Sequence, residues 1–327
     1  MKTGFVFGKF LPLHTGHLAL IDFASRHCDL LYVIICYTSS EPIDGAIREN
    51  WLLSTYYNHP QIRIIAFEYD EQILPNSSES SEEISKIWSA TFKKIVPEAE
   101  IVFTSEKYGD YVASFMGIAH MMYDEYRLET PISATAIRNN PFLHWDEIAP
   151  VARSFFIKKI VLIGTESTGK STLANRLADY FHTTVVPEMA RDIIEKTEEC
   201  TYNDLNKIAA LHATKITERL SPANKLLIVD TDIKTTQSYS LFLFGKELQV
   251  EKWIEEANRF DLYLFLEPDC DFVQDGTRLP ADDRLKLSIH HKEFYLGHGI
   301  ELQYINGTWG QRFEKAVDII RKRFFIE

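Results

Sequence analysis

A glycine-containing turn near the middle of the chain most constrains how it can fold. Residues 160–172 read IVLIGTESTGKST, an apolar run followed by the pattern G-x-x-x-x-G-K-S and then by a helical pattern over 173–180. Between a strand and a helix, this pattern predicts a loop whose backbone N–H groups cradle phosphate oxygens, assisted by the positive end of the helix. The sequence therefore predicts a nucleoside triphosphate site about half-way along 327 residues.

The positions of this loop have separate expected tasks. Lys170 can reach the β- and γ-phosphates, and Ser171 can ligate Mg²⁺. Asp230 ends an apolar strand and is expected to hold Mg²⁺, while Asp232 is the candidate general base for a substrate hydroxyl, with a solvated loop acid as the alternative. The remaining ATP-binding positions of the loop are Gly164, Glu166, Ser167, Thr168, Gly169 and Thr172.

Further charged residues complete the predicted site. Glu188 and Arg191 follow the second strand of this half, where Glu188 could hold or deprotonate a hydroxyl and Arg191 could approach phosphate. The segment 271–288 is rich in Arg and Asp, and its Arg278 and Arg284 are expected to act in a lid that closes on the transferred phosphoryl group and excludes water. Helix capping and a solvated charged loop remain the alternatives.

Composition limits the class of protein. A length of 327 residues suggests two domains, and 45% hydrophobic with 25% charged residues is ordinary for a soluble globular chain. A net charge of -12 disfavours a general binder of nucleic acid or of anionic membranes. The scattered cysteines show no metal spacing, which indicates reduced thiols.

The start of the chain and its apolar runs bear on location. The residues MKTG lead directly into a strand, without a signal peptide and without room for a DNA-binding segment. The longest apolar run, 30–37, is too short to span a bilayer. We therefore expect a cytoplasmic protein that neither binds DNA nor inserts stably into a membrane.

Apolar strand-like runs alternate with helical patterns along the whole chain, which predicts parallel α/β sheets. The runs of the first half are 4–7, 30–37, 62–67, 101–104 and 119–123, and those of the second half are 159–163, 183–186, 226–230, 262–266 and 302–305. We expect two domains, 1–153 and 154–327, each with its own parallel sheet. Ligands of such sheets lie beyond the carboxyl ends of the strands.

The loop after the first strand carries a second constellation. Residues 8–17 read GKFLPLHTGH, with His14 and His17 next to a predicted helix. This loop resembles the H-x-G-H signature of the nucleotidylyltransferase superfamily, which implies that both histidines donate hydrogen bonds to ATP phosphates. The ATP-binding positions of the loop are Gly8, Lys9, Phe10, Leu11 and Gly16. Two histidines at a surface turn without a shared task are the alternative.

A second segment matches the same superfamily. Residues 132–138 read ISATAIR and resemble its I-S-x-T-x-I-R motif. The resemblance implies that Ser133 caps a helix and, with Thr135, contacts ATP, and that Arg138 bridges the phosphates that leave as pyrophosphate. A capped helix with a surface arginine is the alternative.

The acceptor is indicated by the branch of the superfamily. His14 together with the I-S-x-T form resembles nicotinamide mononucleotide adenylyltransferases, and Arg48 lies in a matching R-x-x-W-L segment. Trp88 is a candidate to stack on a pyridinium ring, or else a core residue. Thr104, Ser105 and Glu106 follow the fourth strand and could cradle adenine or ribose, or could only cap the next helix.

The chain resembles the bifunctional nicotinamide-nucleotide adenylyltransferase and ribosylnicotinamide kinase family over nearly its whole length, without the N-terminal DNA-binding segment of some members. The resemblance implies a Rossmann-like adenylyltransferase at 1–153 and a P-loop kinase at 154–327. The implied ligands are ATP, Mg²⁺, nicotinamide riboside, nicotinamide mononucleotide and NAD; a homo-oligomer is left open. The alternatives are a fused phosphopantetheine adenylyltransferase and dephospho-coenzyme A kinase, and a nucleotide-sensing regulator.

Overall fold

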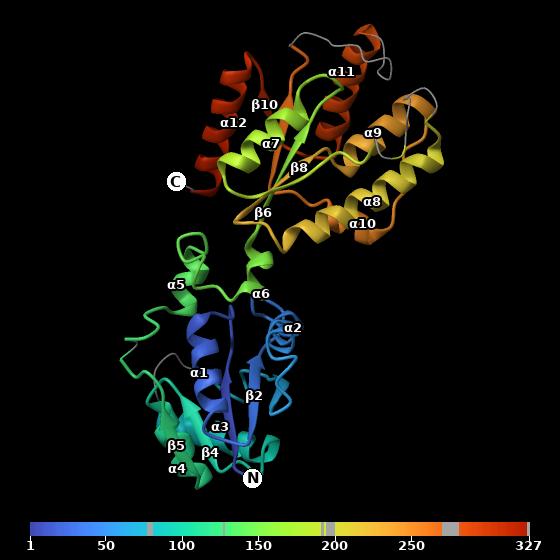
Figure 1. The fold of residues 1–327 in the computed structure, drawn as a ribbon. Coiled ribbons are helices and arrows are strands. Elements are labelled where there is room, and N and C mark those ends of the chain that lie inside the picture. The colour runs from blue at the N-terminus through green and yellow to red at the C-terminus, as the bar shows by residue number, and fades with distance from the viewer. Residues whose placement is uncertain (77–80, 127, 191–192, 194–199, 270–280, 326–327) are drawn as a thin grey trace. The chain divides into compact units, whose positions relative to one another are not determined.

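The structure is a computed structural model that describes residues 1–76, 81–126, 128–190, 193, 200–269 and 281–325. The chain divides into two compact units, Met1–Phe155 and Phe156–Glu327. Within the described residues each unit contains one five-stranded sheet, and every strand pairing is parallel (Figure 1). No helix in the described part of the chain is long and apolar enough to cross a membrane.

The sheet of the first unit has the strand order β3-β2-β1-β4-β5. These strands are rich in β-branched and aromatic residues, and β2 is almost continuously apolar because both of its faces are covered. The order reverses between β1 and β4, so their carboxyl ends flank the crevice in which such sheets bind ligands. The strands are β1 (Thr3–Gly8), β2 (Leu30–Tyr37), β3 (Ile62–Glu68), β4 (Ile101–Thr104) and β5 (Ala119–Met122).

Several helices of the first unit begin at polar caps. His14 caps α1, Ser81 caps α3 and Ser133 caps α5, each by accepting a hydrogen bond from a backbone N–H of the following turn. The apolar faces of α3 and α4 enclose a core around Phe5, Phe92 and Val102. The helices are α1 (Thr15–Ser25), α2 (Gly45–Thr55), α3 (Glu82–Ile95), α4 (Tyr108–Met116), α5 (Ala134–Asn139) and α6 (Pro150–Arg153), and the short 3₁₀ helix η1 (Ser154–Phe156) follows.

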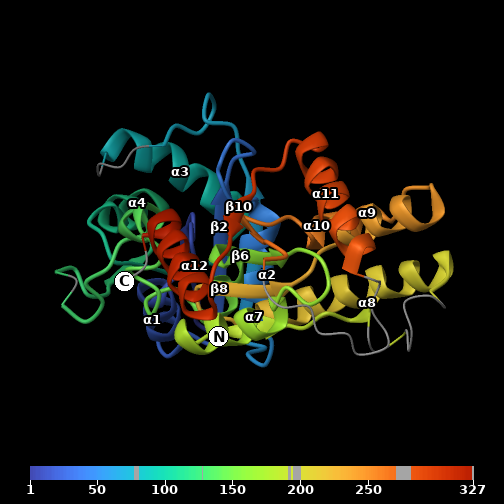
Figure 2. The same cartoon turned by 90° about the horizontal axis from the view of Figure 1, so that it is seen from above.

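The sheet of the second unit has the order β10-β9-β6-β8-β7. Its central strand β6 is buried from Ile160 to Ile163 and feeds directly into the glycine-containing turn. The buried aliphatic side chains of this sheet pack against α7 and α12, which lie side by side (Figure 2). The strands are β6 (Lys158–Ile163), β7 (Thr184–Val186), β8 (Leu226–Asp230), β9 (Leu262–Leu266) and β10 (Gln303–Ile305).

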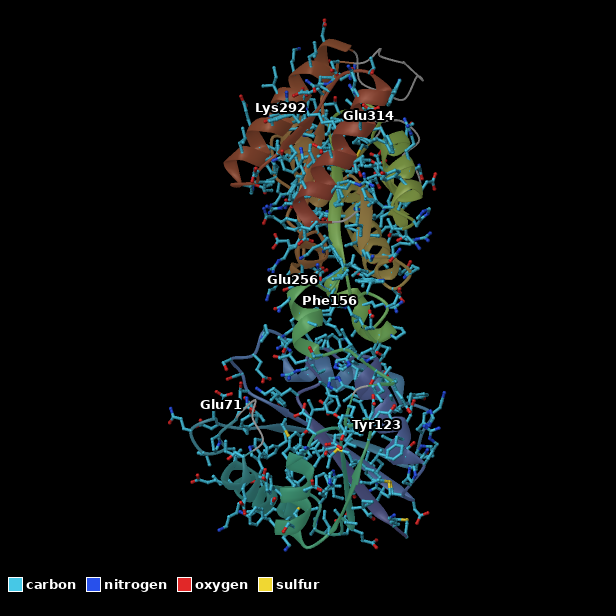
Figure 3. All side chains as sticks on the ribbon, turned by 90° about the vertical axis from the view of Figure 1, so that its left-hand side faces the viewer. Glu71, Tyr123, Phe156, Glu256, Lys292 and Glu314 are labelled. Atoms are coloured by element: carbon cyan, nitrogen blue, oxygen red, sulfur yellow. The ribbon has the colours of Figure 1, made fainter. Side chains whose placement is uncertain are left out.

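The remaining helices of this unit form a second packing group. α9 packs against both α8 and α11, and apolar side chains of α8, α9 and α10 form one buried cluster. Figure 3 shows the side chains of both units on the ribbon. The sequence predicts a helix over 248–258, but α10 begins only at Lys252. The buried Leu248 stays outside the helix, where its carbonyl accepts a hydrogen bond from Gln237 Nε2 at 2.9 Å. The helices are α7 (Lys170–Tyr180), α8 (Tyr202–Leu220), α9 (Ile233–Phe244), α10 (Lys252–Ala257), α11 (Ala281–Gly297) and α12 (Trp309–Phe324).

Candidate active sites

The two histidines of the first unit lie together at the start of α1. The His14 ring Nδ1 accepts a hydrogen bond from the Gly16 N–H at 3.1 Å, so a neutral His14 carries its proton on Nε2. The ring centroids of His14 and His17 are 3.8 Å apart, and the Phe10 ring packs edge-on to His17. The loop therefore places both imidazole rings together beyond the end of β1.

The second predicted motif joins this loop. Arg138 donates through Nη1 to the Leu11 carbonyl at 2.5 Å and through Nη2 to Thr135 Oγ1 at 3.0 Å. Ser133 Oγ accepts the Ala136 N–H at 3.1 Å and caps α5. The two motifs, which are far apart in sequence, thus lie against each other, as their resemblance to one superfamily implies.

Lys9 and Arg48 belong to a partly buried ion cluster that sequence analysis missed. Glu41 pairs with Lys9 Nζ and with Arg48 Nη2, each at 2.7 Å, and Arg48 Nη1 donates to the Lys9 carbonyl at 2.8 Å. Burial opposes the charged form of Glu41, but the two cations hold the pKa of its carboxyl below the usual value. Arg48 has no exposed surface in this structure and holds Lys9 in place; its contact with the substrate stays a prediction.

A cavity of about 230 Å³ adjoins this cluster. Trp88 lines it, but its indole N–H donates to the Pro75 carbonyl at 2.9 Å and its ring packs edge-on against Tyr69. The ring therefore belongs to both the core and the cavity wall. Thr104 is 2% exposed, whereas Ser105 and Glu106 are half-buried. The cavity-lining residues are Phe7, Gly8, Lys9, Cys36, Tyr69, Asn76, Ser81, Ile84, Ser85, Trp88, Tyr108 and Val112.

The phosphate loop of the second unit has the backbone that its glycines and polar residues permit. Gly164 and Gly169 have φ of 138° and 84°, and Ser167 has φ of 58°. Lys170 Nζ donates to the Thr165 carbonyl at 3.2 Å, and Ser171 Oγ donates to Asp230 Oδ2 at 2.5 Å. The loop thus carries its cation and its metal-side hydroxyl where the sequence predicts them.

Asp230 and Ser171 can hold a divalent metal. Burial raises the pKa of the Asp230 carboxyl, and the charge of Lys170 and the hydroxyl of Ser171 oppose that rise. Two adjacent oxygen ligands fit Mg²⁺, which usually keeps several waters and is bound jointly with substrate phosphates. No group of three or more acidic, His or Cys side chains suited to a metal occurs among the described residues.

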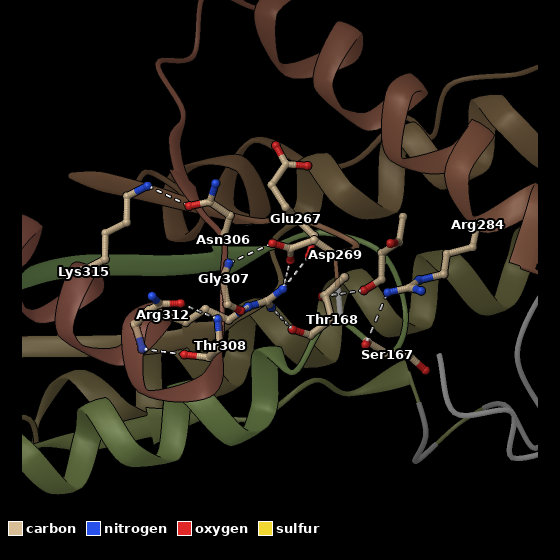
Figure 4. Close-up of polar contacts among 12 residues, drawn as sticks. Ser167, Thr168, Glu267, Asp269, Arg284, Asn306, Gly307, Thr308, Arg312 and Lys315 are labelled. Atoms are coloured by element: carbon tan, nitrogen blue, oxygen red, sulfur yellow. Dashed lines mark hydrogen bonds and ion pairs between the residues drawn. The ribbon is translucent and has the colours of Figure 1, made fainter. Parts of the chain in front are cut away.

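One buried arginine, Arg312, supports the phosphate loop. Arg312 is 1% exposed and donates to the carbonyls of Thr168, Glu267 and Gly307 at 2.7, 2.9 and 2.9 Å (Figure 4). It also pairs with the Asp269 carboxylate. Sequence analysis missed this residue, because a lone arginine within a helix carries no local signal of its partners.

Of the arginines predicted to act in a lid, Arg284 lies within the described residues. Arg284 is 5% exposed and donates through Nε to the Glu166 carbonyl at 2.9 Å and through Nη2 to the Ser167 carbonyl at 3.4 Å (Figure 4). It therefore supports the phosphate loop, and its action on the transferred phosphoryl group stays a prediction. Arg191 and Arg278 lie outside the described residues. Thr172 is exposed in the first turn of α7.

Asp232 is deeply buried at the start of α9. Its Oδ1 accepts hydrogen bonds from the Thr235 N–H at 2.8 Å, from Thr235 Oγ1 at 3.0 Å and from the Tyr295 hydroxyl. Burial raises the pKa of this carboxyl, and the residue is 1% exposed. Glu188 is half-buried, and its charge is near enough to raise the pKa of Asp230. Of the two candidate bases, Glu188 is thus the more accessible.

Sequence comparison identifies the family. A protein named "Trifunctional NAD biosynthesis/regulator protein NadR" from Escherichia coli strain K12 is 34% identical over 316 residues, which cover 89% of this chain and 74% of that protein. The chain belongs to the NadR family. A protein of the same name from Salmonella typhimurium strain LT2 is 32% identical and covers 98% of this chain and 82% of its own length.

Two further comparisons bear on the fold and on the phosphate loop. A family described as "AAA domain" matches residues 159–312, which contain the phosphate loop. A solved NadR protein in complex with NR is 21% identical and covers 100% of this chain and 97% of its own, with a TM-score of 0.79. The family and the α/β fold with two parallel sheets, both predicted from sequence, are thereby confirmed.

Proposed function

We propose that this member of the NadR family catalyses two successive steps of NAD biosynthesis. Residues 154–327 transfer the γ-phosphoryl group of ATP to nicotinamide riboside, and residues 1–153 join the resulting nicotinamide mononucleotide to AMP from a second ATP. The observation that carries the proposal is the pair of separate nucleotide sites on one chain of this family, the histidine loop after β1 and the phosphate loop after β6. The names of the relatives also include regulation, and the proposal concerns only the two enzymatic steps.

The adenylyl transfer follows from the geometry of the first site. A phosphate oxygen of the mononucleotide attacks the α-phosphorus of ATP, and pyrophosphate leaves. Positioning and stabilisation of charge dominate such a step. With its Nδ1 occupied by the Gly16 N–H, His14 offers its Nε2–H as a donor. Arg138, fixed to Leu11 and exposed, supplies a guanidinium for the leaving phosphates.

The phosphoryl transfer follows from the second site. Lys170 and the loop N–H groups bind the β- and γ-phosphates, while Ser171 and Asp230 would hold Mg²⁺. Bound Mg²⁺ neutralises charge on the phosphates and orients them. Glu188 is our candidate to accept the proton of the riboside hydroxyl, because Asp232 has one carboxylate oxygen engaged by three donors and almost no exposed surface.

The substrates are supported by the relatives. NadR proteins have been solved in complex with NR, and with NAD and AMP-PNP. A nicotinamide-nucleotide adenylyltransferase from Thermococcus onnurineus is 26% identical over 49% of this chain. We therefore propose ATP, nicotinamide riboside, nicotinamide mononucleotide and NAD as ligands. The expectations of a cytoplasmic location, of no DNA binding and of an open oligomeric state stay predictions.

Two substitutions test the division of labour. Lys170→Ala should abolish riboside phosphorylation, because the cation on the transferred phosphate is lost, while adenylylation of supplied mononucleotide continues. His17→Ala should have the reverse effect. Both activities are measured on the full chain by chromatography of the nucleotides. Loss of both activities in either well-folded variant would contradict separate sites.

A panel of acceptors with ATP tests the substrate class. We expect turnover of nicotinamide riboside by the wild-type chain and none of dephospho-coenzyme A or pantetheine phosphate. Turnover of dephospho-coenzyme A without turnover of the riboside would refute the proposal. Tight NAD binding with neither activity would instead assign the chain to nucleotide sensing.

A further inference from the structure

A hydroxyl, an imidazole and a carboxylate form a continuous chain at the edge of the first unit. Thr104 Oγ1 lies 2.9 Å from His120 Nε2, and His120 Nδ1 lies 2.7 Å from Asp110 Oδ1. The three residues come from the end of β4, from β5 and from the first turn of α4. The His120 side chain is 8% exposed. Nothing in the two proposed reactions assigns a task to this imidazole.

These three side chains support the turn after β4, which forms one wall of the crevice between β1 and β4. Thr104 Oγ1 donates to the Glu106 carbonyl at 2.7 Å, which ties the hydroxyl to the turn. A carboxylate only accepts, so His120 Nδ1 is the donor in the contact with Asp110. Nε2 also donates to Thr104 Oγ1 when the ring carries a proton on each nitrogen; in the neutral tautomer with the proton on Nδ1, Nε2 is an acceptor for that contact.

The start of α4 rests directly on the Thr104–His120 pair. A Cβ added at Gly109 would lie 2.3 Å from both Thr104 Oγ1 and His120 Nε2. The same helix carries Tyr108 and Val112 into the cavity beside Trp88. A change in how His120 holds Thr104 is therefore transmitted to that cavity wall through less than one helical turn.

The arrangement of hydroxyl, imidazole and carboxylate also occurs where a hydroxyl is activated as a nucleophile. Two observations argue against that use here. The Glu106 carbonyl, which can only accept, lies 2.7 Å from Thr104 Oγ1 and competes with the ring for the hydroxyl proton, and Thr104 is 2% exposed. A support role needs only the contacts that are present.

We propose that His120 is a positioning residue for the bound mononucleotide, acting through Thr104 on the turn after β4 and on the start of α4. The inference rests on the adenylyl transfer proposed above. It extends that proposal to a residue that lines neither the cavity nor the histidine loop. Because the ring contacts Thr104 and Asp110 through two separate nitrogens, the two contacts can be tested separately.

The test compares His120→Gln with His120→Asn in the full chain. The Gln amide can occupy the Nε2 position and keep the contact with Thr104, whereas the Asn amide reaches only the Nδ1 position and keeps the contact with Asp110. We expect Asn to raise the KM and the calorimetric Kd for nicotinamide mononucleotide about tenfold, the effect of one lost partly buried hydrogen bond. Gln should restore both constants to within about threefold of wild type. We expect kcat and the KM for ATP to stay near wild type in both variants.

Three results would overturn the inference. The first is a mononucleotide KM and Kd in the Asn variant that equal those of wild type. The second is an equal loss of kcat in both variants with a lower unfolding temperature, which would make the role purely structural. The third is a covalent AMP adduct on Thr104, detected by mass spectrometry in wild type and absent from the Asn variant, which would make Thr104 a nucleophile.

A failure of the proposed function is distinguishable from these results. If wild type binds no mononucleotide, the adenylyl transfer is wrong. Amide hydrogen exchange of the peptide 104–110 then still tests the positioning. Faster exchange in the Asn variant than in the Gln variant supports the role of His120, and equal exchange in the two refutes it.

Discussion

Two buried histidines should make the second unit sensitive to mild acid. His212 on α8 is 5% exposed and His291 on α11 is 1% exposed. Burial lowers the pKa of His212 to about 4, against a weak opposing effect of the Asp230 backbone. Burial also lowers the pKa of His291 to about 3, and the nearby Lys170 charge adds to this effect. Both rings are therefore neutral in the folded chain at neutral pH.

The sign and size of the effect follow from linkage between protonation and unfolding. Each folded pKa lies below the unfolded value of 6.5, so the unfolded chain binds more protons as the pH falls. The contribution of each histidine is thus intact above pH 6.5 and is lost progressively as the pH falls toward the folded pKa. Between about pH 7.5 and about pH 5 the loss amounts to about 2 kcal/mol for each histidine, or about 4 kcal/mol for both.

The pH dependence of the wild-type free energy of unfolding sums the contributions of several groups. The test therefore compares the pH dependence of a variant with that of wild type. Asp230 and Asp232 have raised pKa values through burial, and their protonation in acid acts in the opposite direction. We expect the double variant His212→Gln/His291→Gln to lose about 4 kcal/mol less than wild type over this interval. The exposed His182, replaced by Asn, which tolerates its φ of 50°, is the matched control and should behave as wild type.

Amide hydrogen exchange of peptides from β6 and β8 in the full chain gives the free energy of opening of this unit separately from the other. Each rate is corrected for the intrinsic pH dependence of exchange. If the double variant loses as much stability as wild type between the two pH values, burial of neutral imidazoles is not the source of the acid sensitivity.

Two further predictions concern the phosphate loop. Gly169→Ala should raise the KM for ATP in riboside phosphorylation about tenfold or more, because φ is 84° and a Cβ would lie 2.1 Å from the Trp309 ring. Gly310→Ala, where a Cβ meets open space, should leave this KM unchanged; an equal effect of both substitutions would refute the steric reasoning. Arg312→Lys should lower the free energy of unfolding of the second unit by about 2–4 kcal/mol in urea, because an ammonium cannot match the planar set of bonds. Adenylylation should persist. An unchanged unfolding curve would contradict the stabilising role of the Arg312 bonds drawn in Figure 4.

The sequence was most informative where function depends on residues close together in the chain. The phosphate loop and the H-x-G-H loop each combine a strand, a turn and a helix within a short segment, and the structure has those elements at those residues. Their local conformations follow from glycine and from short polar side chains near the turn. The alternation of strands and helices was likewise sufficient to predict the parallel sheets.

The sequence was least informative where a side chain acts on distant residues. Arg312 bonds to Thr168, 144 positions earlier, and Glu41 joins two cations from different elements. Arg284 was predicted to act in a lid, and its bond to the Glu166 carbonyl of the phosphate loop had no signal in the sequence. In each case the sequence gives the type of the charged residue but not how deeply its side chain is buried. The depth of burial decides whether the side chain contacts a ligand or supports another residue.

The bonds of Arg312 also bear on the order in which the chain matures during synthesis. The first unit is complete at Phe155, so it can fold while the second is still being made. The phosphate loop, in contrast, receives part of its support from α12, the last helix of the second unit. A ribosome-bound chain that ends before this helix would therefore already carry a folded first nucleotide site but a second one that lacks the bonds of Arg312. The enzyme for the later reaction would mature before the enzyme for the earlier one.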